Sequence, residues 1–471
     1  MFEIKKGLMS HQVLQRNGRG FCETTIVGTS STGGKVQIRV RKGGRVLPGL
    51  DFKRLGTVKK GGFSIKLKGI PAGGHYDISL RLLKSDGTAE GQAEFKDVLV
   101  GDVWILAGQS NMEGIGLLKN AAKPIPLVRA FYMDDRWAVA KDPIHNLGQA
   151  VDQVHTDING GQPCVRPSCV GTGPGVSFGQ EMYRLSGIPQ GLISCAHGGA
   201  SMQHWDPALK KHRGRSLYGA MIRRFEKNGS NIAGVVWYQG ESDAIDGQCR
   251  QYTRRMKKLV ASMRRDFAKP ILPFVMVQLA GYHIVETSRS DACWNAVQDQ
   301  QRLLPKVIDR LAVVPAVDLG LDDCIHIDGI SQQRLGRRLA EAGWMLVSKN
   351  VGKTKTPILL EAIKAVPSHR VDVGYINLEV CFKNVAGRLC SQGRPSGFTI
   401  VSSGGQVQDF IYRVDLVGSK AILKTAIPSN YRAKLRLYYG YGFSPYCNIT
   451  DQADRSIPVF GPIKVRVISK R

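Results

Sequence analysis

Three short polar segments carry the residue types of an acyl-transfer site: Gly108–Met112, Trp237–Ser242 and Asp323–His326. A serine hydroxyl is a weak nucleophile at neutral pH. It needs a base, a group that orients the base, and donors for the developing oxyanion. Ser110 can supply the hydroxyl and His326 the base. Asp323, three residues before the imidazole, can orient it within a single turn.

The remaining roles fall to residues of the same segments and of the glycine-rich stretch Ala196–Trp205. We expect Gln239 to donate its side-chain amide to the oxyanion, together with the backbone N–H groups of Ser110 and Gly199. Glu241 is ambiguous, since it could replace Asp323 as the orienting acid. We expect Asn111 to contact the substrate and Trp205 to form an apolar wall for a sugar face.

Each of these residues also has a plain structural interpretation. A serine after a strand is commonly a helix N-cap, and Gln239 could be a buried amide that ties two loops. Trp205 could simply pack in the core. The acidic loop that holds Asp322, Asp323 and Asp328 resembles loops that bind calcium.

The elements that must position these residues are those of an α/β region at residues 99–350. Apolar runs typical of buried strands alternate with helical patterns, which predicts a parallel sheet with helices on both faces. We expect strands at 103–107, 191–196, 232–238, 271–279 and 311–317, and helices at 216–226, 250–267, 291–304 and 331–347. Ligands bind beyond the carboxyl ends of such strands. The candidate residues should therefore meet at one edge of the sheet.

Both ends of the chain have a different pattern. Residues 1–98 and 351–471 show short alternating strands separated by glycine-rich turns, which predicts two β-sandwich-like domains around the α/β domain. No apolar stretch approaches the roughly 18 residues of a membrane span. The N-terminus lacks a signal-type apolar segment, so we expect either a cytoplasmic protein or one whose leader is absent.

The net charge of +28 favours anionic partners such as an acidic glycan, with nucleic acid as a less favoured alternative. A generally basic, solvated surface is the plainer interpretation. Residues 1–98 hold 18 Lys and Arg against 8 Asp and Glu, and residues 351–471 hold 18 against 7. Among ten cysteines, Cys164 and Cys169 share a loop and could bridge, whereas Cys195 is predicted to be a buried thiol.

Taken together, the segments resemble the sialate O-acetylesterase family, carbohydrate esterases of the SGNH hydrolase superfamily. The similarity extends to all three regions of the chain. Beyond the three site segments it includes Ser10–Arg16, Asp97–Trp104, Gly173–Phe178, Gly191–Ile193, Trp294 with Gln298, Tyr438–Tyr441, and the stretch from Asn448 to Phe460. One departure is Ile327, where the family usually has proline.

This resemblance implies a flavodoxin-like three-layer α/β/α core and a serine esterase, without metal or cofactor, that removes acetyl groups from sugars. Ser110 corresponds to the nucleophile, Asp323 and His326 to the acid and base, and Gly199 and Gln239 to the oxyanion hole. Some related acetylxylan esterases use the glutamate at the position of Glu241 as the acid that orients the histidine. The alternatives are an acetylesterase for xylan or another polysaccharide, or a basic glycan- or nucleic-acid-binding protein with a vestigial esterase core. The sequence gives no oligomeric state.

Overall fold

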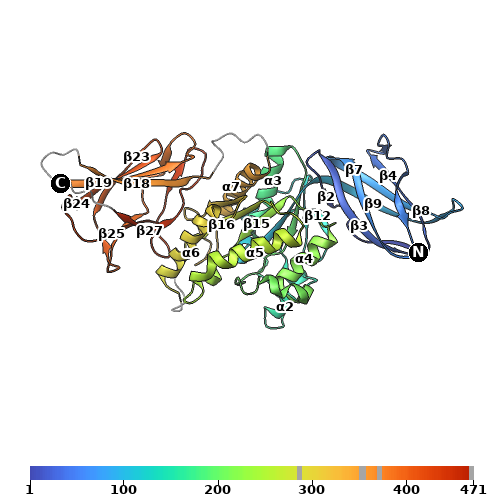
Figure 1. Cartoon of the computed structure of the whole chain (residues 1–471), viewed down its shortest axis with the longest axis horizontal. Coiled ribbons are helices and arrows are strands. Elements are labelled where there is room, and N and C mark those ends of the chain that lie inside the picture. The colour runs from blue at the N-terminus through green and yellow to red at the C-terminus, as the bar shows by residue number, and fades with distance from the viewer. Residues whose placement is uncertain (284–288, 349–356, 369–373, 466–471) are drawn as a thin grey trace.

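The computed structural model describes residues 1–283, 289–348, 357–368 and 374–465. Three regions follow one another along the long axis of the molecule (Figure 1). We call them the N-terminal region (1–98), the central region (99–348) and the C-terminal region (357–465). The expected boundary between 350 and 351 lies outside the described residues. Within the described residues, no helix is long and apolar enough to cross a membrane.

The N-terminal region consists of two β-sheets that enclose their own apolar core. Buried and partly exposed residues alternate along its strands, as expected when one face of a sheet is covered. One sheet has the order β1-β3-β7, and the other pairs β4 with β5, β6 and β8, and β8 with β9. The strands are β1 (Phe2–Lys6), β2 (Val13–Gln15), β3 (Phe21–Ser30), β4 (Gly34–Lys42), β5 (Arg45–Val46), β6 (Lys53–Val58), β7 (Gly61–Pro71) and β8 (Gly73–Leu83).

Strand β9 (Ala89–Gly108) belongs to both the N-terminal and the central region. Its first half pairs antiparallel with β8, and its second half pairs in parallel with β14 and β15. The expected boundary between 98 and 99 therefore falls inside this strand. Its second half is entirely buried, because helices cover both faces there.

The central region contains a parallel sheet of the order β11-β14-β9-β15-β16-β17, with β12 antiparallel at its edge. Helices α3 and α7 lie on one side of these strands, and α4, α5 and α6 on the other (Figure 1). The strands are β10 (Gly116–Leu117), β11 (Val128–Phe131), β12 (Trp137–Val139), β13 (Val170–Thr172), β14 (Gln190–Ser194), β15 (Gly234–Tyr238), β16 (Phe274–Gln278) and β17 (Leu311–Pro315). Four of the five strands expected in this region are confirmed within a few residues at each end, and the strand expected at 103–107 is the last part of the longer β9.

The four expected helices are also present, and three of them begin at a side-chain cap. Ser216, Ser290 and Asp328 each accept a hydrogen bond from a backbone N–H of the first turn. The α-helices are α1 (Ser110–Glu113), α2 (Val154–Asp157), α3 (Gly175–Ser186), α4 (Leu217–Lys227), α5 (Tyr252–Asp266), α6 (Asp291–Leu303) and α7 (Gly329–Val347). The 3-10 helices are η1 (Leu118–Asn120), η2 (Leu147–Gln149), η3 (Pro207–Arg215), η4 (Glu241–Asp243), η5 (Cys249–Gln251) and η6 (Leu304–Lys306).

The sequence pattern does not predict α3, β11 or β12. Helix α3 holds Gly175 and Gly179, which lower its helix propensity. A Cβ on Gly179 would lie 2.6 Å from a methyl group of Val128, so the glycine lets the helix pack closely on β11. Tertiary packing, rather than local propensity, accounts for this helix.

The C-terminal region is all-β, with a core of its own. Its two four-stranded sheets have the orders β18-β19-β24-β23 and β22-β21-β25-β27, and β20 pairs with β26. The strands are β18 (Leu359–Pro367), β19 (Tyr375–Lys383), β20 (Leu389–Ser391), β21 (Phe398–Ser402), β22 (Val407–Gln408), β23 (Ile411–Val417), β24 (Lys420–Pro428), β25 (Leu435–Tyr439), β26 (Ile449–Asp451) and β27 (Phe460–Val465).

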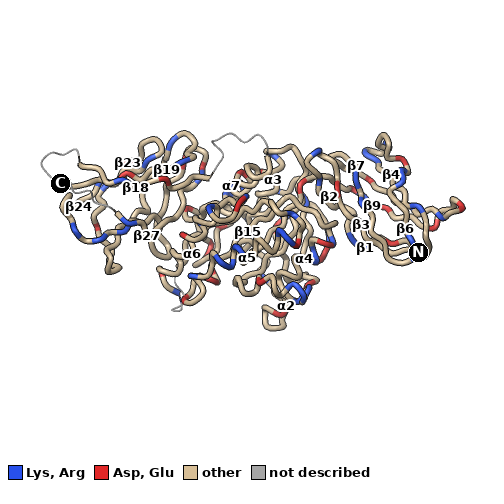
Figure 2. The backbone as a smooth tube through the Cα atoms, viewed as in Figure 1, with Lys and Arg blue, Asp and Glu red and all other residues tan. Residues whose placement is uncertain are grey.

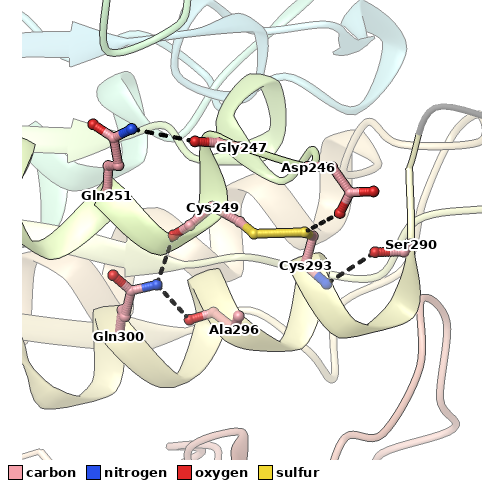
Figure 3. The surroundings of a disulfide bond; sticks show 8 residues. All are labelled: Asp246, Gly247, Cys249, Gln251, Ser290, Cys293, Ala296 and Gln300. Carbon is pink, nitrogen blue, oxygen red and sulfur yellow. Dashed lines mark hydrogen bonds between the residues drawn. A yellow bond between two sulfur atoms is a disulfide. The ribbon is translucent and has the colours of Figure 1, made fainter.

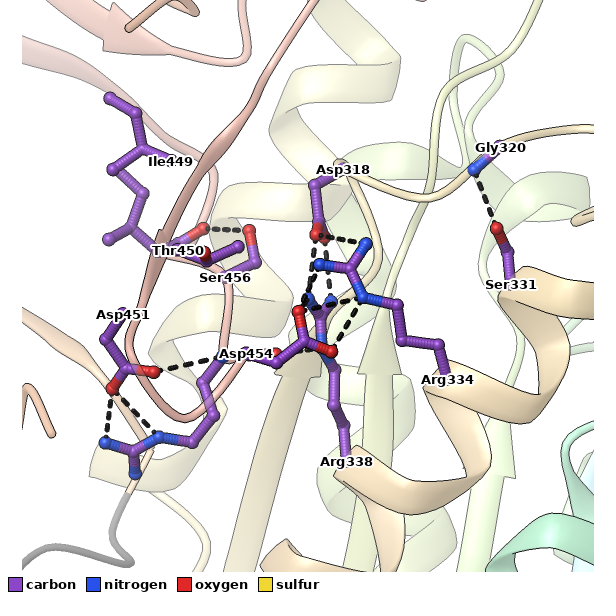
Figure 4. Close-up of polar contacts among 12 residues, drawn as sticks. Asp318, Gly320, Ser331, Arg334, Arg338, Ile449, Thr450, Asp451, Asp454 and Ser456 are labelled. Atoms are coloured by element: carbon purple, nitrogen blue, oxygen red, sulfur yellow. Dashed lines mark hydrogen bonds and ion pairs between the residues drawn. The ribbon is translucent and has the colours of Figure 1, made fainter. Parts of the chain in front are cut away.

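A cluster of ion pairs fastens the C-terminal region to helix α7 (Figure 4). Arg338 donates two hydrogen bonds of 2.8 Å to Asp318, and both side chains are buried. Arg334 lies 3.2 Å from Asp318 and also pairs with Asp454 of the C-terminal region, to which Arg338 donates as well. Two arginines thus hold one carboxylate from each region.

Replacing Arg338 by methionine is expected to lower the free energy of unfolding by roughly 3 kcal/mol, because Asp318 would stay buried with only one cation nearby. Urea denaturation followed by tryptophan fluorescence measures this change. Arg337→Met, at an exposed position one residue earlier, is the matched control and should be nearly neutral. Equal midpoints for the two variants would contradict the proposed importance of the cluster.

Asp97 links the N-terminal region to the central sheet. Its carboxylate is paired with His11 at 3.0 Å, with His75, and with the buried Arg129 of β11 at 2.8 Å. Partial burial alone would raise the pKa of Asp97, but the hydrogen bonds from these three side chains lower it from 3.8 to about 2. A carboxylate with a lowered pKa stabilises the fold above its unfolded-state pKa, and loses this effect as the pH falls through the folded value.

The wild-type protein is therefore expected to lose more stability than Asp97→Asn between pH 4 and about pH 2. Asparagine suits the test because it tolerates the positive φ of 57° at this position. Thermal unfolding of both proteins across this pH range provides the measurement. Parallel pH profiles would show that the carboxylate contributes nothing to the pH dependence.

Candidate active site

The segment with Ser110 begins where β9 ends. Gly108 has a φ of 139°, and a Cβ at this position would lie 2.0 Å from the carbonyl oxygen of Tyr238. The next residue, Gln109, donates its backbone N–H to that same oxygen at 2.8 Å. Glycine thus permits the ends of β9 and β15 to come together, and the chain then turns into α1 with Ser110 as its first residue.

Asp323 and His326 form a compact acid–base turn after β17. The Nδ1 atom of His326 lies 2.6 Å from Oδ2 of Asp323, and the other carboxylate oxygen accepts the backbone N–H groups of Ile325 and His326. Partial burial alone would raise the pKa of Asp323, but these hydrogen bonds lower it below its ordinary value. An ionised Asp323 beside Nδ1 leaves Nε2 as the nitrogen that can take a proton.

Asn111 connects the serine segment directly to the acid–base turn. Its side chain donates to the carbonyl of Ile325 at 3.1 Å and accepts from the N–H of Ile327 at 3.0 Å, and these residues flank His326. Ser110 is the residue before Asn111, so the two segments are held side by side. Asn111 is buried and was expected to contact the substrate. The structure contradicts that expectation, because its amide is used within the protein.

Glu241 is a buried partner of Asn111 rather than of His326. One carboxylate oxygen accepts the Asn111 amide at 2.9 Å, and the other has no hydrogen-bond partner within the described residues. Burial raises the pKa of Glu241, and the nearby His326 partly opposes this effect. The carboxylate within hydrogen-bond distance of the His326 ring is Asp323. The geometry therefore favours Asp323 as the orienting acid.

A glycine turn after β14 lies beside Ser110. The N–H of Gly198 donates to Glu113 of α1 at 2.6 Å, and Glu113 pairs with Arg166 at 2.7 Å. A Cβ added to Gly198 would lie 3.5 Å from Cβ of Ser110, and Gly199 has a φ of 70° with open space beside it. This places the turn with Gly199 next to the hydroxyl. The sequence pattern did not single out Glu113 or Arg166, which hold the turn in place.

Gln239 is not available as an oxyanion donor in this structure. It is fully buried, and its amide nitrogen donates to the carbonyl of Ala200 at 3.2 Å and to Asp243 at 2.7 Å. An amide carries two donor hydrogens, and both are used. The expected role is therefore corrected: Gln239 ties the glycine turn to the loop after β15.

Trp205 is likewise a core residue and not a substrate wall. Its ring is fully buried against Trp237 in an edge-to-face contact of 5.2 Å, and its N–H donates to the carbonyl of Gly108 at 3.2 Å. Its burial rules out the expected contact with a sugar. Through this hydrogen bond, Trp205 instead contacts the end of β9 immediately before the serine segment.

His283 of the central region links the acid–base turn to the C-terminal region. The N–H of His283 donates to the carbonyl of Cys324 at 2.7 Å, and the His283 ring lies 3.2 Å from the hydroxyl of Ser444. Two residues farther along, the side chain of Tyr446 is 70% exposed. Sequence reasoning missed these residues, because nothing local in the sequence indicates that the two segments meet.

A disulfide between Cys249 and Cys293 fastens the end of the loop after β15 to helix α6 (Figure 3). This loop carries Gln239 and Glu241. Cys164 and Cys169, which could have bridged, are free thiols in the structure, and Cys195 is buried as expected. The disulfide therefore restrains the loop that carries Gln239 and Glu241 by linking it to α6.

The acidic residues around the acid–base turn already have protein partners. Asp318 pairs with Arg338, and Asp322 accepts the N–H of Leu117 at 2.9 Å. Asp328 caps α7. Across the described part of the chain, no group of three or more His, Cys, Asp or Glu side chains is arranged to hold a metal ion. The acidic side chains of this loop are thus engaged within the protein.

Comparisons with known proteins show the family to which the central region is similar. The family model for carbohydrate esterases described as sialic acid-specific acetylesterases matches residues 100–345. A probable carbohydrate esterase of Arabidopsis thaliana is 29% identical over 51% of this chain and 89% of its own length. Human sialate O-acetylesterase is 25% identical over 59% of this chain, but the match spans only 57% of the human protein.

The likeness in structure covers nearly the whole chain. A carbohydrate acetylesterase from Xanthomonas citri has a TM-score of 0.73 over 98% of this chain and 99% of its own, at 20% sequence identity. At this identity the likeness concerns the fold alone. The flanking β regions are therefore part of an arrangement seen in another solved protein.

Proposed function

The chain belongs to the carbohydrate esterase family of sialic acid-specific acetylesterases, and we propose that it removes O-acetyl groups from sugars through a serine mechanism. Membership of the family makes it a carboxylic ester hydrolase that acts on acetylated carbohydrates. The proposal adds the residues that perform the reaction and the course of the chemistry. It also takes the core to be of the SGNH type.

The observation that carries the proposal is the pair of hydrogen bonds between Asn111 and the residues on either side of His326, one donated to Ile325 and one accepted from Ile327. These contacts join the segment that carries Ser110 to the turn in which Asp323 lies beside the His326 ring, which supports a reaction between the two side chains. In the first step, Nε2 of His326 takes the Ser110 proton while the serine oxygen attacks the acetyl carbonyl. The oxyanion forms against the backbone N–H groups of Ser110 and Gly199.

Loss of the sugar completes acylation, and attack by water then removes the acetyl group from Ser110. His326 returns its proton to the departing sugar oxygen, and the carbon–oxygen bond to the sugar breaks. Water then attacks the acetyl-enzyme with His326 again as base, which releases acetate and restores the Ser110 hydroxyl. With Gln239 committed elsewhere, backbone groups supply the oxyanion donors in this mechanism.

Among acetylated sugars we propose sialate esters first, because the family model and the human relative carry that name. Acetylated xylan and other polysaccharides are the alternatives. The test is acetate release from p-nitrophenyl acetate and from a panel of O-acetylated sialic acid, xylan and acidic polysaccharide. Release from at least one glycan is expected, and its absence from every member would refute the proposed activity.

A further inference from the structure

Helix α5 and the adjoining 3-10 helix η3 form an exposed face on which positive charge predominates. Figure 2 shows Lys and Arg gathered along α5 and in the neighbouring segments near α2 and α4. We call this the basic face. Its exposed members are Lys210, Lys211, Arg213, Arg215, Arg250, Arg254, Lys257, Lys258 and Arg265. The positive charge is therefore not confined to the two ends of the chain.

Among the described residues, carboxylates pair with four of these nine cations. Arg215 lies 4.0 Å from Asp157, and Arg265 lies 3.5 Å from Asp266. Lys258 pairs with Asp206 at 2.7 Å, and Lys210 with Asp266 at 3.1 Å. Arg254 and Lys257 lie three residues apart in α5 and project from the same side of the helix, and Arg250 precedes them in η5. From Arg254 to Arg265 the part of the face on α5 extends about 16 Å at the helical rise of 1.5 Å per residue. It is long enough to meet several charges of an extended polymer.

A groove of about 480 Å³ runs along this face, between the segment 202–207 and α5. Pro207 gives it apolar surface above the buried Met202 and Leu259, and Gln203 and Gln251 supply amides. Arg254, Arg255 and Lys258 are the cations that line it. Apolar patches with amides beside them suit sugar rings, whose faces are apolar and whose edges carry hydroxyls. Arg255 pairs with Asp243, and Lys258 pairs with Asp206, which also lines the groove. Arg254 has no ion pair among the described residues and suits a carboxylate of a ligand.

The groove is joined to the candidate active site by direct contacts. Met202 lies three residues after Gly199, and its N–H donates to Asp243 at 2.7 Å, the same carboxylate that accepts from Gln239. Arg255 of the groove binds the other oxygen of Asp243 at 2.8 Å. The loop that forms the glycine turn beside Ser110 therefore continues as one wall of the groove.

We propose that this groove and the basic face bind the backbone of an acidic polysaccharide, with its carboxylates on the α5 cations, while an acetylated sugar of the same polymer lies at Ser110. This inference rests on the proposed function and adds the polymeric, anionic nature of the substrate. Nucleic acid fits the groove less well, because its one aromatic lining residue, Trp205, is fully buried and offers no surface on which bases stack.

The test compares Arg250→Glu/Arg254→Glu/Lys257→Glu with the wild-type protein on O-acetylated polygalacturonate, O-acetylated xylan and p-nitrophenyl acetate. At low salt, we expect the ratio of kcat/KM for polygalacturonate to that for p-nitrophenyl acetate to fall about tenfold, mainly through KM. The corresponding ratio for neutral xylan should change little. The matched control, Lys59→Glu/Lys60→Glu/Lys66→Glu, changes the same charge on the N-terminal region and should leave both ratios unchanged.

Binding of deacetylated polygalacturonate gives a readout that does not depend on catalysis. The wild-type protein should bind it with an affinity that decreases as salt is added, and the α5 variant should bind it more weakly with a smaller salt dependence. An α5 variant that matches the wild type in both assays would overturn the inference. So would retention of duplex DNA on this face without retention of the polysaccharide. A wild-type protein that binds polygalacturonate but releases no acetate from any of the substrates would instead refute the proposed function.

Discussion

Replacing Ser110 by alanine is expected to reduce kcat for p-nitrophenyl acetate by at least about 10³-fold, because no other group takes over the acyl transfer. Ser110 is the first residue of α1, beside the glycine turn and next to Asn111. The hydroxyl forms no hydrogen bond within the described residues that would hold the fold together, so the variant should remain folded. Initial rates and a thermal unfolding curve for the same preparation test both statements.

Ser201→Ala is a suitable control for this experiment. Its hydroxyl lies 3.3 Å from His204, outside the residues assigned to the reaction. We expect its activity to remain within a fewfold of the wild-type value. Activity of Ser110→Ala comparable to that of this control would remove Ser110 from the mechanism, whatever the family of the chain.

The second large effect is expected from Asp323→Asn, with a decrease in kcat of about 10³- to 10⁴-fold. An amide at this position cannot stabilise the protonated His326, and it can present N–H instead of oxygen to Nδ1, which then favours the wrong tautomer. The pKa of Asp323 lies below its ordinary value, so the carboxylate is ionised at neutral pH in the native enzyme. Steady-state kinetics on p-nitrophenyl acetate measure the decrease.

Glu241→Gln distinguishes the two candidate acids. Burial raises the pKa of Glu241, which favours its uncharged form. A glutamine oxygen at this position can still accept the hydrogen bond from Asn111. We therefore expect a loss of less than about tenfold. The reverse order, with Glu241→Gln more damaging than Asp323→Asn, would assign the orienting role to Glu241.

The sequence predicted the positions of the strand ends better than the roles of the individual side chains. Apolar runs located β9, β14, β15 and β17, and the rule that parallel strands share an edge brought Ser110, Gly199 and His326 to one end of the sheet. Polar or aromatic character alone suggested that Asn111 and Trp205 face a ligand. It could not reveal that both are buried, because burial depends on what packs above them.

Two further features could not be read from local patterns. The hydrogen-bond partners of Gln239 lie at Ala200 and Asp243, so its commitment becomes visible only once the loops are in place. Net charge counted by segment predicted that the excess of positive charge lies mostly in the two ends of the chain. The basic face arises because η3 and α5 are brought together, although they are some forty residues apart in the sequence.

The continuity of β9 has a consequence for how this protein can be dissected. The strand that delivers Ser110 begins in the N-terminal sheet, and residues 99–101 pair there with β2 while 102–106 pair with β14. Excision of the first 98 residues would cut that strand in two and strip a partner from its remaining half. A break at this junction is therefore expected to lower the free energy of unfolding of the central region.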